Sequence, residues 1–187
     1  GRIFPLKLFG VIGRQHVSVA LSALAGGVMN DLNEVKVIEA LSSFKFPPGR
    51  GRVFPGIEGS TIIDDSYNAS PVAVEAGLET LKEVNTKGKK IAVLGDMLEL
   101  GKHSIEAHKK IGIQASKIAD LLITFGPRSE QIWESAIREG MNTNTARHFN
   151  DHDKTVQFLK NKISEGDLIL VKGSQSMRME KIVAEIL

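Results

Sequence analysis

Residues 60–71 have the sequence STIIDDSYNASP, in which a short apolar strand is followed by a cluster of polar side chains. Ile62 and Ile63 predict a buried strand, and Pro71 predicts the first turn of a helix, because a missing N–H costs nothing there. Two aspartates, a tyrosine and an asparagine lie between these elements. In a parallel sheet they would lie at the carboxyl end of the strand, which is the edge where such sheets bind ligands.

Apolar strands and amphipathic helices alternate from this stretch to the end of the chain. The expected strands are residues 90–95, 119–126, 146–149 and 166–173, and the expected helices are residues 72–84, 104–118, 129–140, 153–163 and 177–187. Residues 51–64 predict a hairpin that turns near Glu58 and Gly59. Such alternation is typical of a parallel sheet covered by helices. The sequence therefore predicts an α/β fold, with a Rossmann-like and mostly parallel sheet and helices on both faces.

The first 48 residues follow a different pattern, with an extended piece and then two helices at residues 16–29 and 31–44. Asn33 is the expected N-cap of the second helix. Two helices and one extended segment bury too little surface to form a core alone. Because the chain also begins without Met, inside an apolar pattern, we expect a short helical piece of a truncated domain. A Pro- and Gly-rich linker at residues 46–56 joins it to the rest.

The composition excludes several classes of protein. The chain has no cysteine, 42% hydrophobic residues and 25% charged residues, which is ordinary for a globular protein and leaves no disulfide framework. No apolar run approaches the roughly 18 residues of a membrane span, and the first residues lack the features of a signal peptide. The net charge of +2 argues against general nucleic-acid binding. We expect a cytoplasmic monomer without membrane insertion.

The polar cluster after the first strand has two interpretations. A carboxylate at this edge can accept hydrogen bonds from two neighbouring ribose hydroxyls, while Asn68 suits a base edge and Tyr67 offers a flat face. Alternatively, Ser66 or Asn68 caps the following helix and the aspartates favour its positive end. Asp64 and Asp65 are not expected to act as an acid/base pair, because neighbouring strand residues face opposite sides of a sheet.

Polar residues also follow the other expected strands. They are Asp96, Glu99, Arg128, Lys172 and Ser174. Lys172, followed by Gly and Ser before a helix, could hold an anion. The chain contains neither a Gly-x-x-x-x-Gly-Lys-Ser/Thr phosphate loop nor a Gly-x-Ser-x-Gly elbow. Its histidines lack the spacing of metal ligands, so we expect no metal site.

The chain resembles the Mur ligase family in three motifs, which occur in the family's order and spacing. They are IIDDSYNASP at residues 62–71, VLGDMLELG at residues 93–101 with His108 and Gly112 after it, and LVKGSQSM at residues 170–177. The resemblance covers the whole chain. It implies that residues 1–48 are the tail of a central ATP-binding domain and that residues 49–187 are the C-terminal domain.

The resemblance implies an ADP-forming amide ligase of peptidoglycan synthesis, most similar to the member that adds D-alanyl-D-alanine to UDP-N-acetylmuramoyl-tripeptide. In that reaction ATP phosphorylates the tripeptide carboxylate, and the dipeptide amine attacks the resulting acyl phosphate. The implied cofactors are ATP and Mg²⁺, held mainly by a central-domain segment that this chain lacks. The fragment alone is therefore expected to be inactive and to contain no catalytic residue.

Two alternatives to this function stay open. The first is another amide ligase of the same superfamily, such as the enzyme that extends folate with glutamate. The family member that adds a diamino acid would be expected to show an Asp-Asn-Pro-Arg motif, which is absent here. The second alternative is a stand-alone nucleotide- or peptide-binding module without catalysis.

The resemblance also assigns nucleotide-binding residues by motif position. Asp65 would hold the ribose hydroxyls, and Tyr67 and Asn68 would lie near the nucleoside. Arg50, in the sequence PPGR, would reach the phosphates from the linker, where the unaided sequence also allows a solvated hinge. Arg52 is the alternative candidate for this contact.

The remaining assignments concern the substrate and the departures from the family pattern. Lys172 and Ser174 would lie toward the incoming dipeptide. The family usually shows Gly-x-His-Asn-x-x-Asn before its helix, but here His16 stands at the first asparagine position and Val19 at the second. An adenine contact from His16 is therefore an open expectation. Gln175 occupies the usual arginine position, which removes a permanent charge.

Overall fold

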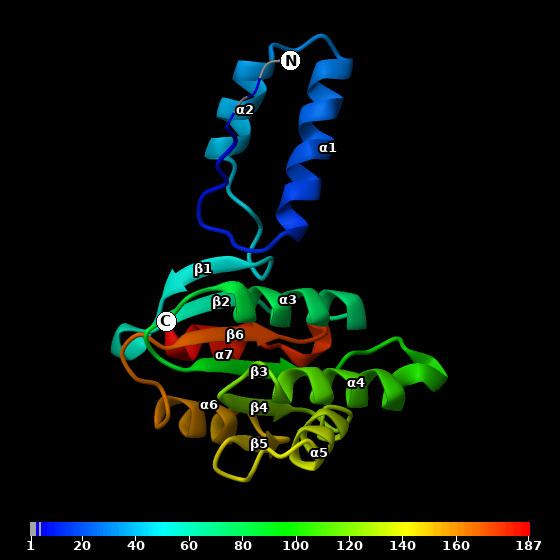
Figure 1. Cartoon of the computed structure of the whole chain (residues 1–187), viewed down its shortest axis with the longest axis vertical. Coiled ribbons are helices and arrows are strands. Elements are labelled where there is room, and N and C mark those ends of the chain that lie inside the picture. The colour runs from blue at the N-terminus through cyan, green and yellow to red at the C-terminus, as the bar shows by residue number, and fades with distance from the viewer. Residues whose placement is uncertain (1–2, 4) are drawn as a thin grey trace.

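The computed structural model describes residue 3 and residues 5–187 and shows an α/β part with a pair of helices standing off one end (Figure 1). Six strands form one sheet in the order β1-β2-β6-β3-β4-β5. Their bounds are Arg52–Pro55 (β1), Thr61–Asp65 (β2), Lys90–Gly95 (β3), Leu121–Phe125 (β4), Ala146–Phe149 (β5) and Leu168–Lys172 (β6). All neighbouring strands are parallel except β1, which runs antiparallel to β2.

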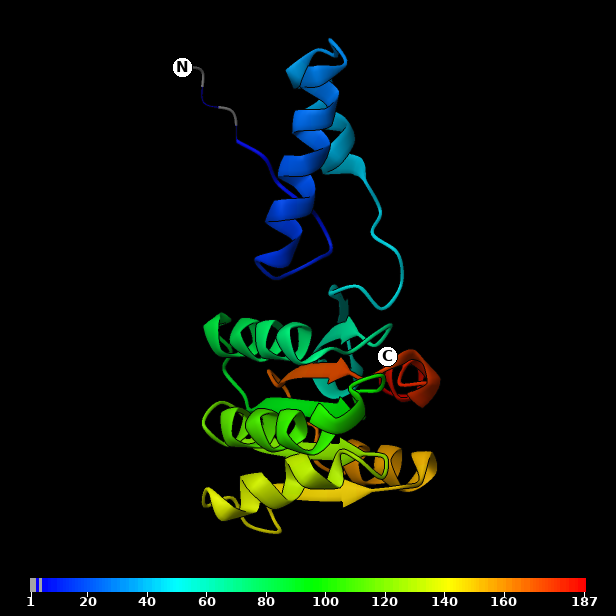
Figure 2. The same ribbon diagram turned by 90° about the vertical axis from the view of Figure 1, so that its right-hand side faces the viewer.

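Helices cover both faces of this sheet, as Figure 2 shows in side view. On one face lie α3 (Pro71–Glu83), α4 (Ser104–Ser116) and α5 (Glu130–Arg138), and on the other lie α6 (His152–Lys160) and α7 (Glu180–Ile186). The predicted α/β class, with a mostly parallel sheet between helices, is confirmed.

The alternation of side chains along the strands builds two hydrophobic cores. In β6, Leu168 and Leu170 pack under α3, while Ile169 and Val171 pack against α7. Every residue of β4 and β6 is buried, which explains why these segments are continuous apolar runs rather than alternating ones.

The predicted hairpin is also present. A short 3₁₀ turn, Ile57–Gly59, connects β1 to β2, with Glu58 and Gly59 both in the left-handed region at φ 54° and 71°. Pairing of Arg52 with Asp64 fixes the register of the hairpin. β1 thus lies within the predicted linker, and the register brings the linker residues before it, 46–51, against the carboxyl end of β2.

The helical pair consists of α1 (Gln15–Met29) and α2 (Glu34–Ser43). Asn33 caps α2 as predicted, because its side-chain oxygen accepts hydrogen bonds from the N–H groups of Val35 and Lys36. In α1 only His16 and Ala20 are buried, and α2 has no buried residue. Within the described part of the chain, no helix combines the length and apolar character that crossing a membrane requires.

The segment before α1 ties the helical pair to the sheet. Val11 forms an isolated antiparallel bridge with Arg52, and the N–H of Ile12 donates to the carbonyl of Gly51 at 3.0 Å. The end of α1 that carries His16 therefore lies beside the linker and the carboxyl edge of β2.

Candidate functional site

The loop after β2 is organised by a helix cap that differs from the one considered from sequence. Ser70 is the N-cap of α3, its hydroxyl accepting from the N–H of Ala73 at 3.3 Å, and Pro71 occupies the first turn as predicted. Asn68 instead accepts from the adjacent N–H of Ala69, and the Ser66 hydroxyl donates to Asp64 at 2.6 Å. Capping by Ser66 or Asn68 is therefore wrong, and the Asn68 side-chain NH₂ is not used in a cap.

Asp64 is a structural anchor for the linker. Its side chain is buried, with one oxygen accepting from the N–H of Gly49 at 3.0 Å and the other from the N–H and hydroxyl of Ser66. The N–H of Tyr67 in turn donates to the carbonyl of Gly49 at 3.1 Å. These contacts fasten the linker to the end of β2, and Asp64 accepts three hydrogen bonds in doing so.

Asp65 faces the opposite side of the sheet, as the strand alternation predicts. Its Oδ2 lies 2.6 Å from Nζ of Lys172, which also donates to the carbonyl of Asn68 at 2.9 Å. The Lys172 side chain is 4% exposed and that of Asp65 is 16% exposed. The two aspartates thus serve different faces and do not form an acid/base pair.

A cavity of about 560 Å³ lies between the start of α1, the linker and the first turns of α3. It is lined by five residues that the sequence assigned to a site, which are His16, Arg50, Asp65, Asn68 and Lys172. Small or apolar residues complete the wall, among them Phe46, Ala73 and Ala76. Sequence reasoning did not select these three.

Arg50 and Arg52 have different surroundings. Arg50 lines the 560 Å³ cavity, from here on called the hinge cavity, and its guanidinium stacks over the Tyr67 ring, 4.1 Å from the ring centroid. Tyr67 itself does not line the hinge cavity. Arg52 lies on β1 with its guanidinium 4.7 Å from the Phe54 ring centroid and does not line that cavity. The structure thus brings Arg50, and not Arg52, together with the residues around Asp65.

His16 closes the inner end of the same cavity. The residue is 7% exposed, its ring packs edge-on against Phe46 at 4.8 Å, and its Nε2 has no hydrogen-bond partner within the described residues. Burial lowers the pKa of His16, although the charge of Asp65 raises it in part. His16 is therefore neutral at pH 7, and its Nε2 is available for a hydrogen bond to a ligand.

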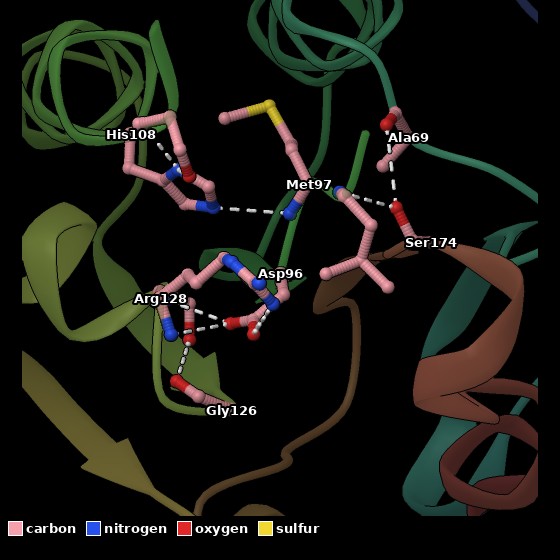
Figure 3. Close-up of polar contacts among 10 residues, drawn as sticks. Ala69, Asp96, Met97, His108, Gly126, Arg128 and Ser174 are labelled. Carbon is pink, nitrogen blue, oxygen red and sulfur yellow. Dashed lines mark hydrogen bonds and ion pairs between the residues drawn. The ribbon is translucent and has the colours of Figure 1, made fainter. Parts of the chain in front are cut away.

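The loop after β3 is held by buried polar contacts, drawn in Figure 3. Asp96 is 1% exposed, and its Oδ1 accepts from the N–H groups of Arg128 and Ser129 at 3.0 and 2.7 Å. The Arg128 guanidinium lies 3.9 Å from the other carboxylate oxygen. Asp96 therefore fixes the start of α5 rather than pointing toward a ligand.

His108 and Ser174 hold the next two residues of that loop. The N–H of Met97 donates to Nε2 of His108 at 3.0 Å, while Nδ1 of His108 lies 2.7 Å from the carbonyl of Ser104 (Figure 3). The N–H of Leu98 donates to the Ser174 hydroxyl at 2.9 Å. His108 must therefore carry its proton on Nδ1, and sequence reasoning, which found no metal role for it, did not predict this one.

Ser174 belongs to a second cavity beside the first. This cavity, of about 480 Å³, is lined by the loops after β2, β3 and β6, at residues 67–70, 98–100 and 174–176. The Ser174 hydroxyl also lies 3.4 Å from the carbonyl of Ala69, so it joins all three loops (Figure 3). The predicted pair Lys172 and Ser174 is thus divided between two neighbouring cavities.

In the chain that the structure describes, no group of three or more His, Cys, Asp or Glu side chains is arranged to hold a metal ion. The polar groups that line the hinge cavity are instead one carboxylate, one guanidinium, one ammonium, two amides, a hydroxyl and a neutral imidazole. This set suits hydroxyl, phosphate and base groups.

Comparison with known proteins matches residues 49–175 to the family described as Mur ligase, glutamate ligase domain. A UDP-N-acetylmuramoyl-tripeptide–D-alanyl-D-alanine ligase of Bacillus subtilis is 33% identical over 179 residues, covering 95% of this chain and 39% of that relative. The corresponding ligase of Escherichia coli is 33% identical over 177 residues, covering 91% of this chain and 36% of that relative. The crystal structure of the MurF ligase of Thermotoga maritima in complex with ADP has a TM-score of 0.82 and 29% identity, covering 97% of this chain and 40% of that chain.

The chain therefore spans well under half the length of these relatives. The family match begins at Gly49 in the linker and extends over more than half of the chain. It includes Arg50, Asp65, Asn68 and Lys172 of the hinge cavity but not His16. The resemblance carried by the motifs is confirmed. This chain belongs to the Mur ligase family.

Proposed function

We propose that this chain is part of an ATP-dependent, ADP-forming ligase that joins D-alanyl-D-alanine to UDP-N-acetylmuramoyl-tripeptide in peptidoglycan synthesis. The two relatives at 33% identity are UDP-N-acetylmuramoyl-tripeptide–D-alanyl-D-alanine ligases, and their similarity extends over nearly the whole chain. The observation that carries the proposal is the hinge cavity, because it brings Arg50 of the linker together with Asp65 and Asn68 at the end of β2 in one nucleotide-sized space.

The parent reaction would proceed through an acyl phosphate. The tripeptide carboxylate attacks the terminal phosphorus of ATP, which forms the acyl phosphate and releases ADP. The dipeptide amine then attacks the acyl carbon, and the resulting tetrahedral intermediate collapses to the amide with loss of inorganic phosphate. We place the phosphate-binding loop and the Mg²⁺ ligands of this reaction outside the present chain, so we expect the chain alone to release no ADP from ATP.

The predicted site residues have the following proposed roles. The carboxylate of Asp65 accepts hydrogen bonds from the ribose hydroxyls, and Tyr67 and Asn68 lie near the nucleoside. The Arg50 guanidinium, held over the Tyr67 ring, reaches the phosphates. We propose that His16 presents its neutral ring to the base. Ser174, in the neighbouring cavity, stays a candidate for the dipeptide side.

We further propose that residues 1–48 are the tail of a central ATP-binding domain and that residues 49–187 form the C-terminal domain. A helix that is apolar all round belongs in the core of a larger unit. The helical pair supports this, since it exposes many large apolar side chains. These are Val17, Val19, Leu21, Val28, Met29, Leu32, Val35 and Phe44. The parent enzyme would act as a monomer in the cytoplasm.

The nucleotide site is tested by titrating this chain with Mg-ADP while amide NMR shifts are followed. Shifts should cluster at residues 64–71 and at the linker. Asp65→Asn should weaken binding by about tenfold or more, because it removes a charge-assisted acceptor. Asp153→Asn, at an exposed position on α6, is the matched control and should bind as the wild type does.

The two arginines provide an internal comparison in the same titration. Arg50→Gln should weaken ADP binding, whereas Arg52→Gln should change it little, because only Arg50 lines the cavity. The opposite ranking would show that the phosphates are reached from β1. Shifts confined to the cavity at residues 98–100 and 174–176 would favour a peptide-binding module instead.

A further inference from the structure

Lys172 is a buried lysine whose ammonium is already paired with a carboxylate. Its ammonium contacts Oδ2 of Asp65 at 2.6 Å and the carbonyl of Asn68 at 2.9 Å, and the residue is 3% exposed. A lysine paired in this way is not a free cation for a phosphate or a carboxylate. The ion pair with Asp65 therefore gives Lys172 a role other than the expected one of holding an anion or the dipeptide.

We infer that Lys172 is a positioning residue, which holds the Asp65 carboxylate in the orientation that receives the two hydroxyls of a ribose. The inference rests on the nucleotide site proposed above. It assigns Lys172 to the nucleotide side of the site, acting through Asp65 rather than on the dipeptide.

The strand register makes this contact a fixed part of the fold. Asp65 and Lys172 are direct neighbours in the parallel pairing of β2 with β6, so their side chains leave the sheet on the same face. On that face Leu170 and Lys172 follow each other under α3, and the lysine stem continues the core toward the edge. Contact between the two charges thus follows from backbone pairing.

A glycine in the middle of α3 lies directly over the side chains of Leu170 and Lys172 on β6. A Cβ at Gly77 would lie 3.5 Å from Cδ of Lys172 and 3.3 Å from a methyl group of Leu170, the second being a crowded distance. Glycine inside a helix costs about 1 kcal/mol relative to alanine. A buried glycine at this point is explained by the close passage of β6 side chains beneath it.

One carboxylate oxygen of Asp65 is paired with Lys172, and the other is available to a ligand. An ionised carboxylate has two oxygens with about four acceptor positions. Lys172 occupies one of them on Oδ2, and no second donor to Asp65 is found within residues 3 and 5–187. Both residues line the cavity, but the lysine is the more buried of the two and its ammonium contacts Oδ2 alone, so it restrains the carboxylate and leaves Oδ1 for hydroxyl donors. Such restraint lowers the ordering cost that binding must meet.

The test compares Mg-ADP with Mg-2′,3′-dideoxy-ADP on the whole chain, for wild type and variants, by NMR titration. Wild type should bind ADP about tenfold more tightly than the dideoxy compound, since it alone offers the hydroxyls. Lys172→Met should reduce this preference to below about threefold while changing the dideoxy affinity little. Lys110→Met is the matched control, because that lysine is 71% exposed and pairs with Glu75 on the helix surface.

Two further variants keep the test decisive if Lys172→Met does not fold. Lys172→Gln retains a donor on a shorter stem and should give an intermediate preference. Gly77→Ala retains the lysine, whose Cδ the new methyl group would meet only at an ordinary contact distance of 3.5 Å, and should keep the wild-type preference. In an Asp65→Asn background, Lys172→Met should have no additional effect on the preference.

The outcomes separate this inference from the proposed function. Wild type without any preference for ADP would overturn the ribose role of Asp65, and both proposals with it. A wild-type preference that persists in Lys172→Met and Lys172→Gln would overturn the positioning role alone. Equal loss of affinity for both nucleotides would also overturn it, since Lys172 would then contact a part of the nucleotide that both share.

Discussion

Replacing His108 by leucine should destabilise the α/β part and flatten its dependence on pH. In the wild type, the imidazole accepts from the N–H of Met97 and donates to the carbonyl of Ser104, with His108 and Met97 both fully buried. Leucine has a similar volume but no acceptor, so the Met97 N–H would be buried without a partner. An unsatisfied buried donor costs about 1–3 kcal/mol. For a chain of this size, a loss of about 2 kcal/mol lowers Tm by roughly 4–8 °C.

The pH dependence follows from the direction of the His108 pKa. Burial lowers that pKa below the usual value near 6.5, which the hydrogen bond to Ser104 and the charge of Asp96 only partly offset. As pH falls below about 6.5, the unfolded chain takes up a proton that the folded chain does not, so the free energy of unfolding decreases until the folded-state pKa is reached. Protonation of Nε2 would also break the bond from Met97.

The assay is urea unfolding of wild type and His108→Leu between pH 5 and pH 8. The slope of the free energy of unfolding against pH should be smaller in the variant by up to about 1.4 kcal/mol per pH unit. Burial also lowers the pKa of His16 and of His148, so part of the slope stays. His103→Leu, at an exposed turn, serves as the control. An unchanged midpoint at pH 7.5, or an unchanged slope below pH 6.5, would refute the assigned tautomer and its structural role.

Two further predictions concern packing and domain organisation. Gly112→Ala should lower the free energy of unfolding by about 2 kcal/mol or more, because its methyl group would meet the carbonyl oxygen of Ile132 and lie 2.8 Å from Cβ of Ser135. Gly26→Ala in α1 has open space around it and should be neutral or stabilising by about 0.5–1 kcal/mol. Equal midpoints of thermal unfolding for the two variants would argue against close packing of α4 on α5. Residues 49–187 expressed alone should give amide NMR shifts that match those of the whole chain away from the linker, and a collapsed spectrum would place the domain boundary elsewhere.

The elements of the fold could be predicted because the apolar pattern is nearly unambiguous after residue 49. Strands such as β4 and β6 are continuous apolar runs, and α3 places Val74, Leu78 and Leu81 on one buried face, as its periodicity indicates. The cap of α2 at Asn33 was also predictable from local chemistry. These features depend on residues that are near one another in the sequence.

The details of the site depend on residues that only the fold brings together. Lys172 lies 107 positions from Asp65, and neither the strand order nor the register between β2 and β6 can be obtained from one sequence. The same limit applies to Asp96, whose place after β3 indicates a ligand edge but whose carboxylate is used to fix the start of α5. The choice between Arg50 and Arg52 required the direction in which the linker enters β1.

The doublet Asp64-Asp65 explains why the end of β2 is so polar. β2 ends both at the ligand-binding edge of the sheet and beside the linker. Because successive side chains of a strand point to opposite faces, one carboxylate lies on each face. On one face Asp64 holds the linker through Gly49, and on the other Asp65 lines the hinge cavity together with Lys172, its ion-pair partner. Because Arg50 follows Gly49 directly, the anchor that fixes the linker also sets where the guanidinium begins. The position of one proposed phosphate contact is thus coupled to the strand that carries the proposed ribose contact.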